Sequence, residues 1–138
     1  MKSDCCATWA PRMLSVLRIV SGYLFLLHGA TKLFVMHVPL ASLYGVAGVI
    51  EFIGGILILL GLFGRVAAFI CSGEMAFAYF MGHVAAKGHV LTPINNGGDA
   101  AVLFCFVFLY IAAAGPGPWS IDHLRHKARH SQRPGHLI

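Results

Sequence analysis

Charged residues are scarce in this chain, and acidic ones especially so. Of its 138 residues, 11% are charged and only 5 are Asp or Glu, whereas 58% are hydrophobic. About a quarter of the residues in an average soluble domain are charged, and this length suffices for one domain only. A soluble domain of this composition would have too little polar surface to cover itself. The composition therefore favours a membrane protein.

The motifs of several reaction classes are also missing. The 4 cysteines form no C-x-x-C pair and match no zinc-site spacing. Without a G-x-G-x-x-G, P-loop or G-x-S-x-G motif, nucleotide hydrolysis and nucleophilic catalysis have no support. Di-iron bundles require Glu-x-x-His pairs, which the apolar segments lack, so no metal is expected. Cys71 and Cys105 are predicted to be small apolar helix residues, and Cys5 and Cys6 to be exposed cytoplasmic thiols.

Apolar segments separated by turn-forming residues are the main feature that is present. About 20 apolar residues cross a bilayer as a helix, and backbone groups in lipid must be satisfied within the segment. The expected spans are residues 13–34, 44–62, 66–85 and 98–114. Gly115-Pro116-Gly117-Pro118 ends the last span. We therefore predict an all-α fold, an antiparallel bundle of four transmembrane helices that makes one domain over residues 1–138. The first span is expected to be retained and not cleaved as a signal peptide.

The positions of Lys and Arg predict the orientation of this bundle. With the N-terminus inside the cell, only Lys32 and Lys87 face outward. The remaining basic residues face the cytoplasm: Lys2, Arg12, Arg18, Arg65, Arg125, Lys127, Arg129 and Arg133. This bias follows the positive-inside rule, so both termini are expected in the cytoplasm. The basic tail, residues 119–138, is expected near anionic lipid headgroups and not on nucleic acid.

Ionisable residues inside membrane spans are costly and mark function or a specific partner. With a rise of about 1.5 Å per residue, His28 and Glu51 lie at one depth, about 10 Å below the outer surface. Lys32 is one turn above His28 on the same face and could reach Glu51. Gly48, Glu51 and Gly55 share a helix face, which turns Glu51 towards the bundle interior. The expected polar cluster in the outer half contains His28, Lys32, Glu51, His83 and Asp99.

Arg18 and Glu74 make a second expected pair, because their depths differ by only about 6 Å. Two interpretations of the buried charges stay open. They could form a proton or quinone site, or they could be ion pairs that fix helix register. His83 could also simply extend to the outer interface.

Four sequence segments, taken in order, resemble the DoxX family of membrane proteins. They are Leu26-Leu27-His28-Gly29-Ala30-Thr31-Lys32-Leu33-Phe34; Glu51-Phe52-Ile53-Gly54-Gly55 with the turn at Gly64-Arg65; Asn96-Gly97-Gly98-Asp99; and Gly115-Pro116-Gly117-Pro118-Trp119. The resemblance spans roughly residues 13 to 122. It implies four transmembrane helices in the bacterial cytoplasmic membrane, and it adds Asn96 to the candidate site. It assigns no catalytic residue.

The resemblance also implies a functional setting. The family takes its name from a subunit linked to quinone-dependent oxidation of reduced sulfur compounds, and some members are associated with oxidoreductase complexes or with thiol and oxidative stress. We therefore expect an accessory subunit of a redox complex that binds a quinone. In this interpretation His28 and Lys32 donate hydrogen bonds to the quinone, and Glu51 or Asp99 handles a proton. A scaffold without chemistry and a small-solute or proton permeation protein remain the alternatives, so an enzymatic activity is not assigned.

Overall fold

The structure, a computed structural model, describes the backbone of residues 3–131 and the side chains of residues 7–131. All elements in this part are helical. The chain forms α1 (Ser3–Ala30), the π-helix η1 (Thr31–Val35), α2 (Leu43–Leu60), α3 (Gly64–Ala78), the π-helix η2 (Tyr79–Val84), α4 (Ala85–Lys87), α5 (Pro93–Asn96), α6 (Asp99–Ala114) and α7 (Ile121–Ser131). The π-helices continue the preceding helices without a break, so α3, η2 and α4 form one continuous helical segment.

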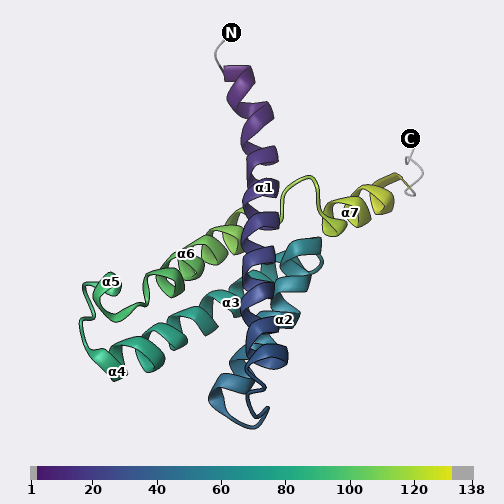
Figure 1. Cartoon of the computed structure of the whole chain (residues 1–138). Coiled ribbons are helices and arrows are strands. Elements are labelled where there is room, and N and C mark those ends of the chain that lie inside the picture. Colours follow the sequence, from purple (N-terminus) through teal and green to yellow (C-terminus); the bar gives the residue numbers. More distant parts are fainter. Residues whose placement is uncertain (1–2, 132–138) are drawn as a thin grey trace, which may run out of the picture.

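The long helices pack as two antiparallel hairpins, one made of α1 and α2 and the other of α3 and α6 (Figure 1). Glycines allow the first pair to pack closely. A Cβ atom built on Gly55 would lie 2.6 Å from the backbone nitrogen of Leu26, and one on Gly22 would lie 2.7 Å from that of Leu59. These separations are shorter than any normal contact, so only glycine permits this approach of the two backbones.

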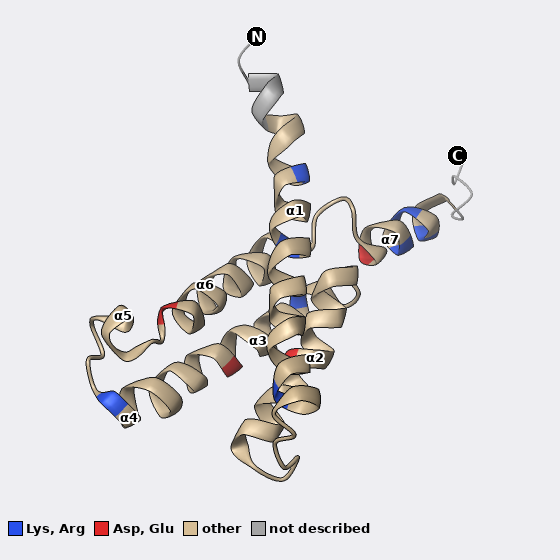
Figure 2. Ribbon diagram, viewed as in Figure 1, with Lys and Arg blue, Asp and Glu red and all other residues tan. Residues whose placement is uncertain are grey.

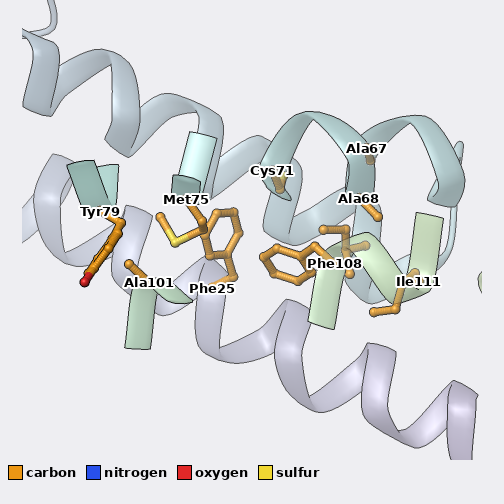
Figure 3. Packing of buried hydrophobic residues seen from close by; sticks show 10 residues of the cluster. Phe25, Ala67, Ala68, Cys71, Met75, Tyr79, Ala101, Phe108 and Ile111 are labelled. Carbon is orange, nitrogen blue, oxygen red and sulfur yellow. The ribbon is translucent and has the colours of Figure 1, made fainter. Parts of the chain in front are cut away.

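The apolar core lies mainly between α3 and α6, with Phe25 of α1 inserted beside it (Figure 3). Small side chains such as Ala67 and Ala68 on α3 face Phe108 and Ile111 on α6. The Phe25 ring meets the Phe108 ring edge-on, with 4.8 Å between centroids. Phe25 therefore joins the first hairpin to the second.

At one end of the molecule, three charged side chains hold backbone groups that the helices leave unpaired. Arg18 is fully buried and donates to the carbonyl oxygens of Ile58, Leu59, Pro116 and Trp119. Arg65 donates to the last carbonyls of α6, and the Asp122 carboxylate accepts from the backbone N–H groups of Phe63 and Gly64. Helix ends lack internal partners for these groups. These contacts fix the α2–α3 turn and the Gly115–Pro118 segment against the hairpins.

The turn between α2 and α3 also depends on backbone conformation. Gly61 ends α2 with a φ of 67°, and Phe63 precedes α3 with a φ of 50°. A left-handed residue after a helix is usually glycine, whereas for phenylalanine this conformation is unusual. The two bonds from Phe63 and Gly64 to Asp122 compensate for it.

Three of the predicted segments coincide with helices: 44–62 with α2, 98–114 with α6, and 66–85 with the α3–η2–α4 segment. The first, 13–34, lies within α1 and η1, but α1 begins ten residues earlier, at Ser3. The sequence also did not predict the two π-helices, α5 in the expected loop between Lys87 and Asn96, or α7 in the tail. Lys2, Arg133 and the thiols of Cys5 and Cys6 fall outside the described residues, and nothing tests their predicted roles.

Two helical segments, Ala7–Val35 and Leu43–Leu60, are long and apolar enough to cross a membrane, whereas Asp99–Ala114 is apolar but shorter. Arg12 and Arg18 lie on α1 and further basic residues on α7, while acidic residues of α2 and α3 lie midway along the hairpins (Figure 2). The chain is thus all-helical with two candidate membrane spans. The bundle of four transmembrane helices stays a prediction.

Candidate functional site

A partly open cavity of about 420 Å³ lies between the two hairpins. Most of its wall is apolar or aromatic. Its polar or ionisable side chains are His28, Lys32, Tyr44, Glu51, Glu74 and His83. Cavities of this size, with an apolar wall and a few convergent polar groups, are typical small-molecule sites. This cavity is therefore the candidate functional site.

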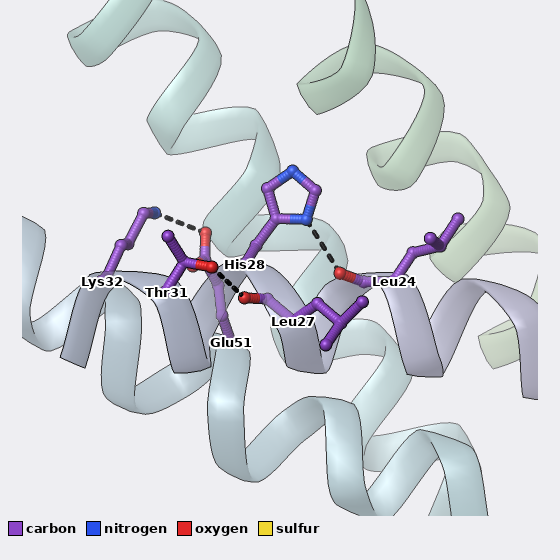
Figure 4. A network of polar contacts seen from close by, with 6 residues as sticks. All are labelled: Leu24, Leu27, His28, Thr31, Lys32 and Glu51. Carbon is purple, nitrogen blue, oxygen red and sulfur yellow. Dashed lines mark hydrogen bonds and ion pairs between the residues drawn. The ribbon is translucent and has the colours of Figure 1, made fainter. Parts of the chain in front are cut away.

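Lys32 and Glu51 form an ion pair across the first hairpin, with 2.6 Å between Nζ and Oε1 (Figure 4). The Glu51 side chain is 2% exposed, so it points into the interior as the Gly48–Glu51–Gly55 face predicts. A Cβ atom on Gly48 would lie 3.1 Å from the Lys32 Cβ, so glycine there gives the lysine room. The second carboxylate oxygen of Glu51, Oε2, is buried without a partner among the described residues.

The two histidines of the wall have the same hydrogen-bonding arrangement. His28 Nδ1 lies 2.8 Å from the carbonyl oxygen of Leu24 (Figure 4), and His83 Nδ1 lies 3.3 Å from that of Asn96. A carbonyl oxygen can only accept, so each Nδ1 carries the hydrogen. In a neutral imidazole Nε2 is then an acceptor. The His28 ring also stands edge-on to Phe104 of α6, with 5.7 Å between centroids.

The predicted pair of Arg18 and Glu74 is wrong. Arg18 donates to carbonyl oxygens near the turn between α2 and α3, while Glu74 lines the cavity. Two residues at a similar depth can still point in different directions around their helix axes. Arg18 and Glu74 do so, and they therefore do not meet. Glu74 Oε2 is buried without a partner among the described residues, and the charges of Glu51 and Lys32 act on this carboxyl group.

The structure also separates Asn96 and Asp99 from the cluster. Asn96 is fully buried, but its amide donates to the Gly88 and His89 carbonyl oxygens and its Oδ1 accepts from the Gly98 N–H. It therefore organises the loop before α6. Asp99 is exposed in the first turn of α6, where the helix dipole favours an acid, and it does not line the cavity.

Both π-helices border the cavity, one in each hairpin. η1 carries Lys32, and η2 carries Met81, Gly82 and His83 of the wall. Single π-turns inside α-helices occur frequently at functional sites. Sequence patterns gave no signal for the π-helices.

The sequence analysis also missed Tyr44 and Phe104 of the cavity wall. Phe104 lies three residues after Ala101 and four before Phe108, on the buried face of α6, and this helical spacing could have revealed it.

Comparison with known proteins identifies the family. The model of the DoxX family matches residues 13–84, which is more than half of the chain. The chain belongs to the DoxX family. The matched region contains α1 from Met13 onward, η1, α2, α3 and η2, and with them every polar side chain of the cavity wall.

A curated protein also aligns with most of this chain. It is an uncharacterised protein of Haemophilus influenzae, 46% identical over 123 residues, covering 83% of this chain and 92% of the relative. No solved structure matches the chain. Family membership and the two long apolar segments together indicate a membrane protein. Among the described residues, no three His, Cys, Asp or Glu side chains are grouped to hold a metal ion.

Proposed function

We propose that this DoxX protein binds the headgroup of a membrane quinone in the cavity and serves as an accessory subunit of a redox complex. The cavity between the hairpins is the observation that carries the proposal, because it combines an apolar wall with Lys32, Glu51, Glu74 and two histidines. A quinone headgroup is a flat, largely apolar ring with an oxygen atom at each end. A site for it needs aromatic or aliphatic walls and a few polar groups that fix the two oxygens.

The residues of the wall supply these interactions. Phe104 and Tyr44 offer faces for the ring, and the Lys32 ammonium donates to an oxygen atom while it stays paired with Glu51. When a quinone oxidises a reduced substrate, it gains two electrons and two protons. A partner redox protein would supply the electrons, and the side chains of His28 and Glu74 would relay the two protons. Asp99 has no part in this scheme because it lies outside the cavity.

The membrane arrangement belongs to the same proposal. Four spans would be formed by α1–η1, α2, α3–η2–α4 and α6, with both termini in the cytoplasm of a bacterium. The basic residues on the N-terminal part of α1 and on α7 support this orientation. Single cysteines placed in the Ser42 region and in α7, in a background without the native cysteines, would be labelled from opposite sides of the membrane. Labelling of both from one side would contradict four spans.

Thermal unfolding of the detergent-purified protein with ubiquinone and menaquinone analogues tests quinone binding. A ligand at 100 times its Kd stabilises the folded state by about 2.7 kcal/mol, which raises the Tm measurably. Gly82→Leu would fill the cavity, because Gly82 lines it and a Cβ there meets nothing within 4 Å. Gly73→Leu is the matched control, since Gly73 has similar free space but does not line the cavity.

We expect a rise in Tm for the wild type and for Gly73→Leu, and none for Gly82→Leu. No rise with any quinone, together with no co-purified quinone, would refute the binding site. The scaffold would then be favoured, since the glycine contacts of α1 and α2 serve packing alone. Proton or solute flux in proteoliposomes would instead be required for a permeation protein.

A further inference from the structure

The wall of the cavity offers several hydrogen-bond acceptors. His28 and His83 each use Nδ1–H on a backbone carbonyl, which leaves Nε2 as an acceptor. Glu51, 2% exposed, has Oε2 buried without a partner in the described part of the chain, and Glu74 Oε2 is in the same condition. A buried acceptor without a donor is unfavourable. Two such oxygen atoms, with the two histidine Nε2 acceptors beside them on the wall, therefore indicate a ligand that donates hydrogen bonds.

Donors on the same wall are few. Lys32 is the one Lys or Arg on it within the described residues, and its ammonium is already paired with Glu51 and lies 5.5 Å from the centroid of the Tyr44 ring. The Tyr44 hydroxyl can donate, but it can equally accept. Two carboxylates also face one ammonium. If both are ionised, this wall is short of positive charge and of hydrogen-bond donors.

The acceptors are divided between the two hairpins. His28 and Glu51 belong to α1 and α2, whereas Glu74 and His83 belong to α3 and η2. A flat ring with a hydroxyl at each end could donate to the first hairpin at one end and to the second at the other. An oxidised quinone has two carbonyl oxygens and no donor. It can use Lys32, but at its other end it would face further acceptors.

Building on the proposed quinone site, we infer that the cavity selects the reduced, dihydroxy form of the ligand over the oxidised quinone. The preference follows from the acceptors His28 Nε2, His83 Nε2, Glu51 Oε2 and Glu74 Oε2. A bound quinone would then be a stronger electron acceptor than the free quinone, because the cavity holds its reduced form more tightly. Lys32 holds Glu51 in place through the ion pair at Oε1.

Anaerobic titration calorimetry of the detergent-purified full chain tests this selection. A short-chain quinone, its quinol and the 1,4-dimethoxy ether of that quinol are compared, because the ether keeps the shape without the donors. We expect the quinol to bind at least tenfold more tightly than the other two. By linkage, a tenfold preference raises the midpoint potential of the bound two-electron couple by about 30 mV, which a redox titration measures independently.

Glu74→Gln replaces one acceptor by an amide that also donates, so the preference for the quinol should fall several-fold. Asp99→Asn is the matched control outside the cavity and should leave the preference unchanged. Equal binding of quinone and quinol would overturn the selection but leave the quinone site standing. If none of the three compounds binds, both the quinone site and the selection for the quinol are refuted. Tighter binding of a lipophilic amine, such as a long-chain alkylamine, than of the quinol would show that the acceptors serve a cation instead.

Discussion

Charged side chains gather at two places in this molecule, and their partners differ. Near the α2–α3 turn, the buried Arg18 donates to four carbonyl oxygens, Arg65 caps α6, and both oxygens of Asp122 accept from backbone N–H groups. At the cavity, Glu51 has one partner for two oxygens, and Glu74 has an unpaired buried oxygen. The first set joins segments of backbone, and its polar atoms are occupied by these bonds. The second set has carboxylate oxygens that are still able to bind a ligand.

This difference separates a structural role from a ligand-binding role. Both sets contain ionisable residues in or beside apolar helices, and such residues indicate function by default. A fully satisfied charge can be explained by architecture alone, whereas an unsatisfied buried oxygen needs a further explanation. Substitutions near the α2–α3 turn should therefore lower stability most, and substitutions at the cavity should change ligand binding most.

Arg18→Met should have the largest effect. It removes the guanidinium donor from four carbonyl oxygens, of which that of Ile58 keeps the Gly61 N–H, and detaches the Gly115–Pro118 segment. We therefore expect a loss of about 4 kcal/mol in unfolding free energy. Thermal unfolding and the yield from membranes measure it. Arg12→Met, at an exposed position, is the control and should cost less than about 0.5 kcal/mol. An Arg18→Met protein as stable as the wild type would show that Arg18 does not hold the α2–α3 turn and the Gly115–Pro118 segment together.

Lys32→Met should come next, at about 3 kcal/mol, because it leaves the buried Glu51 carboxylate without a counter-charge. The double variant Lys32→Met/Glu51→Gln removes both charges and should recover most of this loss. Unfolding of the wild type, both single variants and the double variant gives the coupling energy. Additive effects would mean that the pair contributes nothing.

Asp122→Ala should cost about 1 kcal/mol, because the Phe63 and Gly64 N–H groups lose the acceptor that caps α3. Asp99→Ala is the comparison, because it removes an exposed acid from the start of α6. We expect it to lower the unfolding free energy by about 0.5 kcal/mol, through the lost interaction with the helix dipole. Chemical or thermal unfolding of both variants measures this. A larger loss for Asp99→Ala would contradict the assignment of Asp122 as the cap.

Glu74→Gln should have the smallest effect on stability, within about 0.5 kcal/mol, because no partner among the described residues is lost. We expect Glu74→Gln to act on ligand binding instead, by lowering the preference for the quinol over the quinone. Paired unfolding and calorimetry of one preparation separate the two effects. A strong destabilisation without any change in binding would place Glu74 with the structural charges.

Much of the fold could be predicted from the sequence, and less of the site. Apolar segment length and the glycine–proline stop at Gly115 gave most helix boundaries, because these depend on local composition, but α1 extends ten residues before its predicted start. The contact of Lys32 with Glu51 followed from depth and from the glycine face of α2. The Arg18–Glu74 pair failed, because its prediction used depth without direction. Asn96 was added to the cluster by the family motif and Asp99 by its place near the outer end of its span. The structure places the amide of Asn96 on loop carbonyls and leaves Asp99 exposed.

The sequence by itself determined that this chain is helical, apolar and a DoxX protein, because these properties reside in composition and in short ordered motifs. Only the tertiary structure decided which charges share a cavity. The packing of one hairpin against the other sets the direction of each side chain around its helix axis. That packing directs Glu74 towards the cavity that Glu51 also lines, and Arg18 towards the backbone.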